Sequence, residues 1–200
     1  MWPWEHAMFA YVFYSLYLRG RYRARPEDWS VVALVFGSVL PDLVDKPLAW
    51  QFGLFESGYA AAHSVFVAVP LSLVVILVAK RHGQSRIGAA FAVGYLLHLV
   101  GDVLPASLSR GRLYLDPILW PFAEPHQTDH VANGGSFLDG VRGLLSEYVA
   151  QLVTMEVTAV VALQLGSVMF GTALWILDGR PGVKPVTNAI KKALERGRSR

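Results

Sequence analysis

The sequence contains no cysteine. Disulfides, cysteine-ligated zinc, iron–sulfur clusters and thiol nucleophiles are therefore excluded, and any bound metal must be held by histidine and carboxylate side chains. Charged residues are also scarce, at 16% of the 200 residues, whereas 54% are hydrophobic and the mean hydropathy is +0.38. This composition is too apolar for a soluble domain of this length and predicts an integral membrane protein.

Five apolar segments predict an all-α membrane helical bundle with about five transmembrane helices. The expected spans are residues 4–18, 31–44, 59–79, 87–104 and 149–177, within one membrane domain over residues 1–180. The second span is shorter than the roughly 20 residues that a bilayer requires, and Pro41 lies near its end, so we expect this helix to be thin or broken there. Residues 105–148 then form a long loop, and residues 181–200 form a basic tail, amphipathic from about Val186 to Arg196.

Basic residues are concentrated in three of the connecting segments. They follow the first span, separate the third from the fourth, and follow the fifth: Arg19, Arg21, Arg23 and Arg25; Lys80, Arg81 and Arg86; and the tail after Asp178. By the positive-inside rule these segments are cytoplasmic, which leaves the N-terminus and the long loop outside the cytoplasmic membrane. The topology accounts for the net charge of +3, so no nucleic-acid partner is expected.

Acidic and imidazole side chains gather at the outer face of this topology, although only Lys and Arg were used to derive it. They lie near the outer ends of four spans: His6, Asp42 with Asp45, His63, and His98 with Asp102. Ionisable groups inside hydrocarbon cost about 2.5 to 3.5 kcal/mol each on insertion scales, so several at one depth indicate a functional site. Asp42 and Asp45 are three residues apart, and His98 and Asp102 are four apart, so each pair shares one face of a helix. The pattern predicts a metal site.

Simpler interpretations stay open for individual residues. His98 and Asp102 also fit a structural ion pair buried in the bundle. A lone histidine near the end of a span, such as His6, is more often an interfacial residue than a metal ligand. His63 followed by Ser64 resembles a base beside a serine nucleophile, but adjacent helical residues point in different directions, which disfavours that reading.

The chain resembles the YdjM-type membrane-bound metal-dependent hydrolases over residues 1 to about 122. Four short motifs carry the resemblance through their order and spacing: Gly37–Asp45, His63–Ser64, Gly94–Asp102 and Leu119–Phe122. The resemblance implies a membrane protein with several spans and a hydrolytic metal site whose substrate is undefined.

A more distant likeness is to zinc-dependent phospholipase C and the related single-strand nucleases. Their zinc cluster uses His, Asp, His and then His-x-x-x-Asp, and the candidate residues occur here in that order. The superfamily adds a further His and a His with an acidic partner, for which this chain offers His126 and His130 but no clear His-x-x-x-Glu. The likeness therefore implies a mononuclear or dinuclear site, and His126 and His130 are equally well read as solvated loop residues.

The expected chemistry is hydrolysis. Histidine and carboxylate ligands suit zinc, with manganese or another divalent ion as an alternative, and a metal with an open position lowers the pKa of bound water to about 7. Asp42 and Asp45 are the candidate catalytic carboxylates, and Asp45 is either a ligand or the group that orients a ligand or the water. Lys46, Arg110 or Arg112 would neutralise a phosphate.

A site at the outer interface meets lipid headgroups laterally, so we expect a phosphoester substrate, with phospholipid or a small molecule as candidates. Two other classes of function are compatible with the same residues. One is a proton- or ion-coupled transporter that uses the His and Asp cluster as a relay, although the two halves of the chain show no convincing repeat. The other is a membrane scaffold without catalysis.

Overall fold

The computed structural model describes residues 1–123, 137–153 and 159–198. Within these ranges the chain forms helices and turns and no strand, which confirms the all-α class. The helices are α1 (Pro3–Tyr22), α2 (Asp28–Trp50), α3 (Val65–Arg81), α4 (Ser85–Arg110), α5 (Phe137–Val153), α6 (Ala159–Leu177) and α7 (Val183–Arg198), with a 3-10 turn, η1, at Asp116–Ile118.

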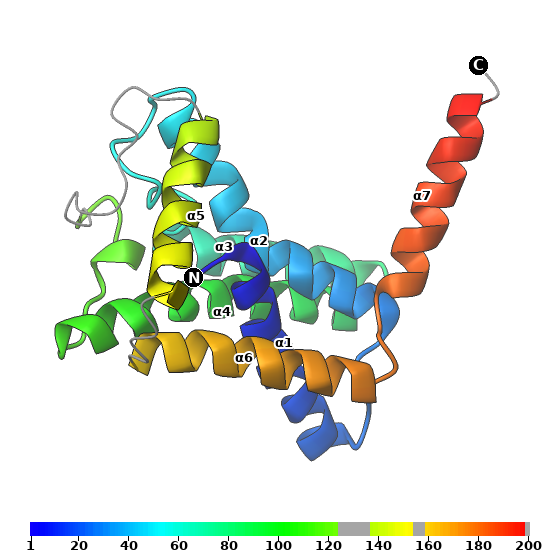
Figure 1. Ribbon diagram of the computed structural model, residues 1–200. Helices are drawn as coiled ribbons and strands as arrows, with labels where there is room; N and C mark the ends of the chain where they lie inside the picture. Colours follow the sequence, from blue (N-terminus) through cyan, green and yellow to red (C-terminus); the bar gives the residue numbers. More distant parts are fainter. Residues whose placement is uncertain (124–136, 154–158, 199–200) are drawn as a thin grey trace.

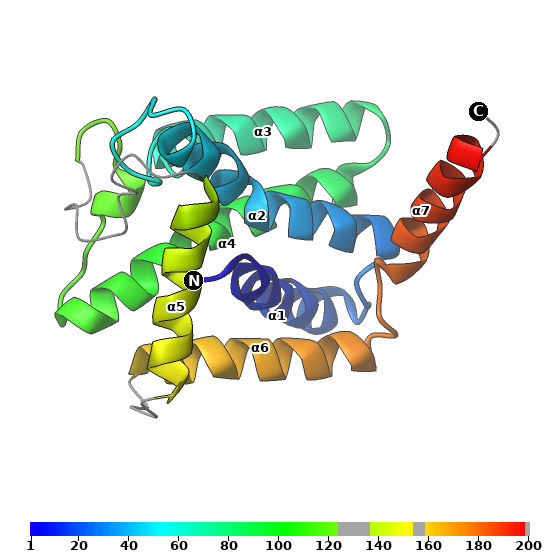
Figure 2. The ribbon, with the colours of Figure 1, turned by 45° about the horizontal axis from the view of Figure 1, so that its top comes forward.

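Helix α4 lies at the centre of the bundle, in contact with α1, α2, α3 and α6. Helices α2, α3, α4 and α6 run roughly side by side, and α5 crosses them at the end where the N-terminus lies (Figures 1 and 2). Helix α7 projects from the opposite end. The first half of the chain therefore supplies most of the packed bundle.

Two glycines bring the backbones of α2 and α4 into direct contact. A Cβ atom on Gly94 would lie 2.1 Å from the carbonyl oxygen of Leu34, and one on Gly37 would lie 2.3 Å from the carbonyl oxygen of Phe91. Small residues at such a crossing allow close helix packing in membrane proteins. The crossing holds Ser38 of α2 against His98 of α4, whose Nδ1 atom is 2.7 Å from the Ser38 carbonyl oxygen.

The prediction of a thin or broken second helix is wrong. Helix α2 continues without interruption through Pro41 and Pro47 to Trp50. A proline removes one backbone hydrogen bond and strains the preceding turn, but the close packing of α2 on α4 outweighs this local preference. Neighbouring helices commonly stabilise proline-containing helices in this way.

The third helix starts later than expected, so the predicted helical span over residues 59–79 is wrong in its first turn and a half. Residues 59–64 form turns, and α3 begins at Val65. The backbone N–H groups of Ala60, Ala62 and His63 all donate to the carboxylate of Asp45. This carboxylate holds the segment in a non-helical form and lets it wrap around the end of α2.

The expected fifth span over residues 149–177 is divided between α5 and α6, and residues 154–158 lie outside the described part. Most of α5 falls in the segment that we expected to be a long loop. Hydropathy alone missed this helix because it is amphipathic: Gly140 packs on the ring of Trp50, and Tyr148 packs edge-on against Trp2.

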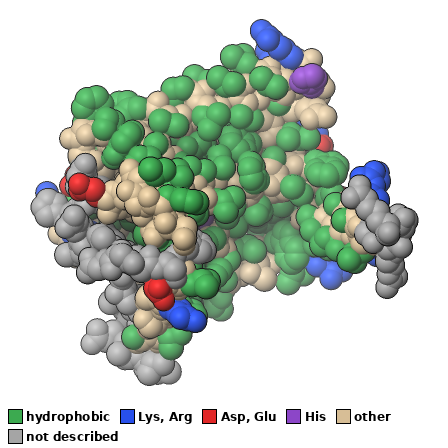
Figure 3. All heavy atoms as spheres, turned by 90° about the horizontal axis from the view of Figure 1, so that it is seen from above, with side chains coloured by type: hydrophobic (Ala, Val, Ile, Leu, Met, Phe, Trp, Pro, Cys, Tyr) green, Lys and Arg blue, Asp and Glu red, His purple; other side chains and the backbone are tan. Residues whose placement is uncertain are grey.

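Two helices of the described chain, α4 and α6, are long and apolar enough to cross a membrane. Other helices also expose large hydrophobic side chains, among them Phe13 on α1, Phe36 on α2 and Leu73 on α3. In Figure 3 hydrophobic side chains cover most of the visible face, whereas Lys and Arg side chains lie toward its margins. This distribution is typical of a surface that contacts lipid.

A buried polar network joins the far end of α1 to the end of α6. The Asp178 carboxylate accepts hydrogen bonds from the hydroxyls of Tyr11 (2.7 Å) and Ser15 (2.5 Å), and it forms an ion pair with Arg19. Burial opposes the negative charge, but these hydrogen bonds and the guanidinium lower the pKa of Asp178 below its ordinary value. The carboxylate therefore stays ionised and ties the two helices together.

Candidate metal centre

Five of the residues singled out from the sequence meet at one end of the bundle. They come from four segments: His6 of α1, Asp42 of α2, His63 in the turn before α3, and His98 with Asp102 of α4. The three histidines are completely buried, and the two carboxylates are 7% and 6% exposed. Residues that are far apart in the chain thus share one enclosed volume.

The ligand atoms lie within a few ångströms of one another. The Nε2 atoms of His63 and His98 are 3.1 Å apart. Asp102 Oδ2 lies 3.2 Å from His98 Nε2, and Asp42 Oδ1 lies 3.4 Å from His63 Nε2. His6 Nε2 is 3.3 Å from the other oxygen of Asp102. Two overlapping groups result, one of His6, His98 and Asp102 and the other of Asp42, His63 and His98, each with ligand atoms within 4.8 Å.

Hydrogen bonds assign the tautomers of the two central histidines. His98 Nδ1 is 2.7 Å from the carbonyl oxygen of Ser38, and His63 Nδ1 is 2.8 Å from Asp45 Oδ2. A carbonyl and a carboxylate oxygen only accept hydrogen bonds, so each Nδ1 donates and each neutral ring carries its lone pair on Nε2. Two lone pairs therefore face each other across 3.1 Å. They repel unless a proton or a metal ion lies between them.

Unpartnered buried atoms at the same place fit a metal ion. His6 Nε2, Asp42 Oδ2 and Asp102 Oδ2 are buried and make no hydrogen bond within the described structure, although His6 Nε2 and Asp102 Oδ2 lie at ion-pair distance from other members of the cluster. Buried polar atoms nearly always have a hydrogen-bond partner, so three such atoms in one cluster need an explanation. Imidazole nitrogens and carboxylate oxygens are the donors that zinc and other divalent ions prefer. The residues present therefore fit a divalent metal ion.

A glycine provides the space for His6. A Cβ atom on Gly101 would lie 2.8 Å from His6 Nδ1, so the imidazole packs directly on the backbone of α4. The ring also stacks on that of His98, with centroids 3.8 Å apart. The N-terminal turn of α1 is thereby held beside the cluster.

Asp45 lies behind His63 and outside the converging ligand atoms. Its carboxylate accepts the backbone N–H groups of Ala60 (2.9 Å), Ala62 (3.0 Å) and His63 (2.9 Å), as well as the imidazole Nδ1. Both oxygens are engaged and the residue is completely buried. Of the roles considered for Asp45, the geometry favours the one that orients a ligand.

Ser64 stands apart from the cluster. The Ser64 hydroxyl donates to the carbonyl oxygen of Trp120 (2.6 Å) and accepts from the N–H of Phe66, so it caps the start of α3. It is not poised as a nucleophile. His126 and His130, the additional ligand candidates, lie outside the described residues.

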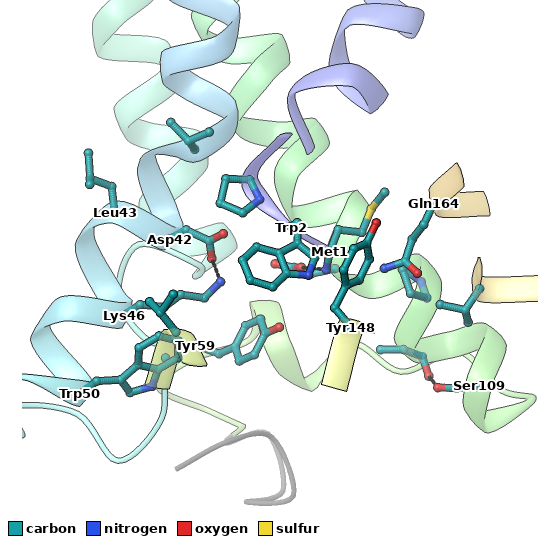
Figure 4. Close-up of a pocket in the computed structure, with 18 of the residues that line it drawn as sticks. Met1, Trp2, Asp42, Leu43, Lys46, Trp50, Tyr59, Ser109, Tyr148 and Gln164 are labelled. Atoms are coloured by element: carbon teal, nitrogen blue, oxygen red, sulfur yellow. Dashed lines mark hydrogen bonds and ion pairs between the residues drawn. The ribbon is translucent and has the colours of Figure 1, made fainter. Parts of the chain in front are cut away.

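A cavity of about 680 Å³ opens beside the cluster and reaches Asp42 and Asp102. Figure 4 shows Asp42 and Lys46 of α2 on one side, with the side chains of Trp2 and Tyr148 across from them, and Tyr59 also lines the cavity. Lys46 Nζ is 2.5 Å from Asp42 Oδ1. The cavity lining thus combines the ionic groups of Asp42 and Lys46 with aromatic side chains.

Two other cations were considered from the sequence as phosphate partners. Arg110 lines the cavity, whereas Arg112 is exposed and is not among the lining residues. The lining also includes aromatic residues that sequence reasoning did not assign to the site, because they come from the N-terminus, the end of α2 and α5.

Sequence reasoning also missed Glu5, which is completely buried. Its carboxylate accepts hydrogen bonds from the N–H of Trp2 (2.8 Å) and the side-chain amide of Gln164 (3.1 Å), so it fastens the start of α1 to α6. A proline followed two residues later by an acidic residue is typical of a helix start. Pro3 and Glu5 carry that signal.

Comparison with models of protein families assigns most of the chain to a known family. Residues 1–177 match the family described as YdjM inner membrane protein. No curated protein and no solved structure is significantly similar to the chain. The match covers both candidate membrane spans and all five clustered ligands. The chain therefore belongs to the YdjM inner membrane protein family.

Proposed function

We propose that this protein is a membrane-bound metal-dependent hydrolase that cleaves phosphoesters, with phospholipids as the first candidates, at the outer membrane–water interface. The main support is the pair of histidine Nε2 atoms 3.1 Å apart, beside two buried carboxylates that each have one oxygen without a hydrogen bond. The same carboxylates line a cavity large enough for a ligand.

The clustered residues have distinct roles in this proposal. His6, His63, His98, Asp42 and Asp102 would hold one or two divalent ions. When bound, such an ion acts as a Lewis acid and makes a water molecule reactive at neutral pH. The Ser38 carbonyl and the Asp45 carboxylate hold the two central rings in the tautomer that ligation requires, since groups behind a ligand fix its orientation.

The cavity supports an amphiphilic phosphoester as substrate. Lys46 provides a positive charge in the cavity lining, and the aromatic side chains suit the apolar part of such a molecule. Hydrolysis adds water across the bond between phosphorus and the ester oxygen and yields a phosphate and an alcohol. In our proposal the unpartnered Asp42 Oδ2 accepts a proton from the attacking water, and the departing oxygen is protonated from solvent.

We further propose that five helices, α1 to α4 and α6, cross the membrane, with the metal cluster at the outer end. The large exposed hydrophobic residues on these helices support this arrangement. So do the basic residues, which lie at the ends of α1, α3 and α6 that are remote from the cluster.

Metal content provides the direct test. Detergent-purified wild-type protein is compared with His98→Ala and Asp102→Ala by mass spectrometry after dialysis against a weak chelator. His82→Ala is the matched control, because it removes an exposed imidazole at the end of α3. We expect zinc or manganese near stoichiometry in the wild type and the control, and loss of metal from both cluster variants.

Activity is then measured on phospholipids and small phosphoesters with each variant. We expect turnover by the wild type and His82→Ala that falls by about 100-fold or more in His98→Ala, because the cluster ligands carry the hydrolytic chemistry. If folded wild-type protein binds no metal and cleaves no phosphoester, the proposal is wrong and a transporter or scaffold becomes the better explanation.

A further inference from the structure

Helix α7 carries an apolar face that is largely exposed. Val183, Val186, Ile190 and Leu194 recur at intervals of three or four residues, which places them on one side of the helix. Their side chains are 41%, 46%, 53% and 65% exposed. These four residues are called the apolar face of α7.

The rest of the helix is basic. Lys184, Lys191, Lys192 and Arg196 lie outside the apolar face and are exposed, and Glu195 is the only acidic residue between positions 183 and 196. The helix therefore combines an aliphatic stripe with a strongly cationic remainder. This combination is typical of helices that lie in the plane of an anionic membrane surface.

The base of α7 is attached to the bundle, so the direction of the helix is defined. The N–H of Gly182 donates to Asp28 Oδ1 (2.7 Å), and the indole N–H of Trp175 donates to the carbonyl oxygen of Pro181 (3.0 Å). Pro181 and Gly182 are buried. From this base α7 extends away from the other helices (Figures 1 and 2).

The position of that base matches a membrane boundary. Helix α6, a candidate membrane span, ends at Leu177, and α7 starts at Val183. Exposed arginines lie at the same end of the bundle, including Arg21 at the end of α1 and Arg86 at the start of α4. A helix that starts at this level is placed to meet the lipid headgroups directly.

We propose that the apolar face of α7 binds the surface of the surrounding bilayer, at the face opposite the metal cluster, and that anionic lipid headgroups bind its basic residues. Charge complementarity favours this occupant over a protein surface: each Lys or Arg near an anionic leaflet contributes about 1 kcal/mol, or roughly fivefold in binding, and α7 presents four of them. The bound helix fixes the depth of α6, whose end is tied to α1 through Asp178.

The absence of cysteine makes a site-specific test clean. Full-length Ile190→Cys and Asn188→Cys proteins are labelled with an environment-sensitive fluorophore and placed in vesicles of phosphatidylcholine and phosphatidylglycerol. At about 3.6 residues per turn, Asn188 lies on nearly the opposite side of α7 and serves as the matched control. We expect the label at position 190 to shift to the blue and to be quenched by lipid-attached nitroxide. The label at position 188 should be quenched by aqueous iodide.

Three outcomes would overturn the inference. Equal iodide quenching at positions 188 and 190 would show that the apolar face is in water. Protection at position 190 without nitroxide quenching would assign the face to a protein partner or a second copy of the chain. If the label at position 190 gives the same blue shift in vesicles of phosphatidylcholine alone as in the mixed vesicles, anionic headgroups do not contribute to binding, and that part of the inference is wrong.

Discussion

At the scale of single residues, the candidate centre depends on what lies behind its ligands. Both oxygens of Asp45 accept hydrogen bonds, from three backbone N–H groups and from the His63 ring. The same carboxylate therefore stabilises the turn before α3 and orients the His63 ring. The sequence identified Asp45 as a candidate but left its role open. Only the positions of its partners distinguish an orienting carboxylate from a ligand.

Replacement of this carboxylate tests that role. Asp45→Asn removes the charge and turns an amide NH₂ toward backbone N–H donors, so we expect zinc affinity to fall about 10- to 100-fold, as is typical when a group behind a metal ligand is lost. Competition with a chromophoric chelator measures the affinity. Asp139→Asn, at an exposed carboxylate of α5, is the control and should keep wild-type affinity. Unchanged affinity in Asp45→Asn would refute the orienting role.

At the scale of helices, the centre depends on how closely α2 approaches α4. Gly37 and Gly94 remove the side chains from the crossing, and the resulting contact is made by backbone atoms that cannot move aside independently. The hydrogen bond from His98 to Ser38 spans the same crossing, one helical turn beyond Gly94. Helix packing and the geometry of a ligand are therefore coupled.

A single added methyl group should disturb both the packing of α2 on α4 and the geometry of the metal centre. Gly94→Ala places a Cβ atom 2.1 Å from the Leu34 carbonyl oxygen, so the helices must separate. Overpacking of this kind costs about 1 to 3 kcal/mol of folding free energy. We expect a lower midpoint of thermal unfolding in detergent together with reduced metal content.

Gly166→Ala on α6 is the matched control, because its added Cβ atom would meet no atom within 4 Å. It should leave the unfolding midpoint equal to or slightly above that of the wild type, since alanine favours a helix more than glycine does. If Gly94→Ala is as stable and as metal-loaded as Gly166→Ala, the close crossing does not control the centre.

At the scale of the whole molecule, the two ends of the bundle differ in chemistry. The cluster of His and Asp residues and its cavity occupy one end, and the basic ends of α1 and α3, the Asp178 network and the base of α7 occupy the other. The positive-inside rule then predicts a cytoplasmic basic end and an outer metal cluster.

Thiol accessibility in the cysteine-free chain tests this orientation. Ser109→Cys lies at an exposed position near the cavity, and His82→Cys lies at an exposed position at the basic end. In spheroplasts we expect a membrane-impermeant maleimide to label position 109 but not position 82. Inverted vesicles should give the reverse, and the opposite pattern would place the cluster on the cytoplasmic side.

Local sequence patterns predicted the fold class and several residues of the candidate site. Hydropathy predicted the all-α class, and the positions of acidic and imidazole residues near the ends of the expected spans identified five residues that cluster in the structure. Runs of apolar residues and spacing within a helix are properties of neighbouring residues, which is why the sequence shows them. The amphipathic tail was also expected, and α7 spans Val183–Arg198. Pro41 suggested a break in α2 because the sequence shows the hydrogen bond that a proline removes but not the packing on α4 that stabilises the helix.

Tertiary contacts decided the remainder. Continuation of α2 through Pro41, the non-helical turn before α3, the orienting position of Asp45 and the aromatic cavity all depend on atoms contributed by segments distant in sequence. Helical periodicity brings His98 and Asp102 together, but the 3.1 Å separation of the His63 and His98 Nε2 atoms exists only because two glycines let α2 reach α4 and Asp45 turns His63 toward them. Packing between distant segments, which no local pattern encodes, sets that distance.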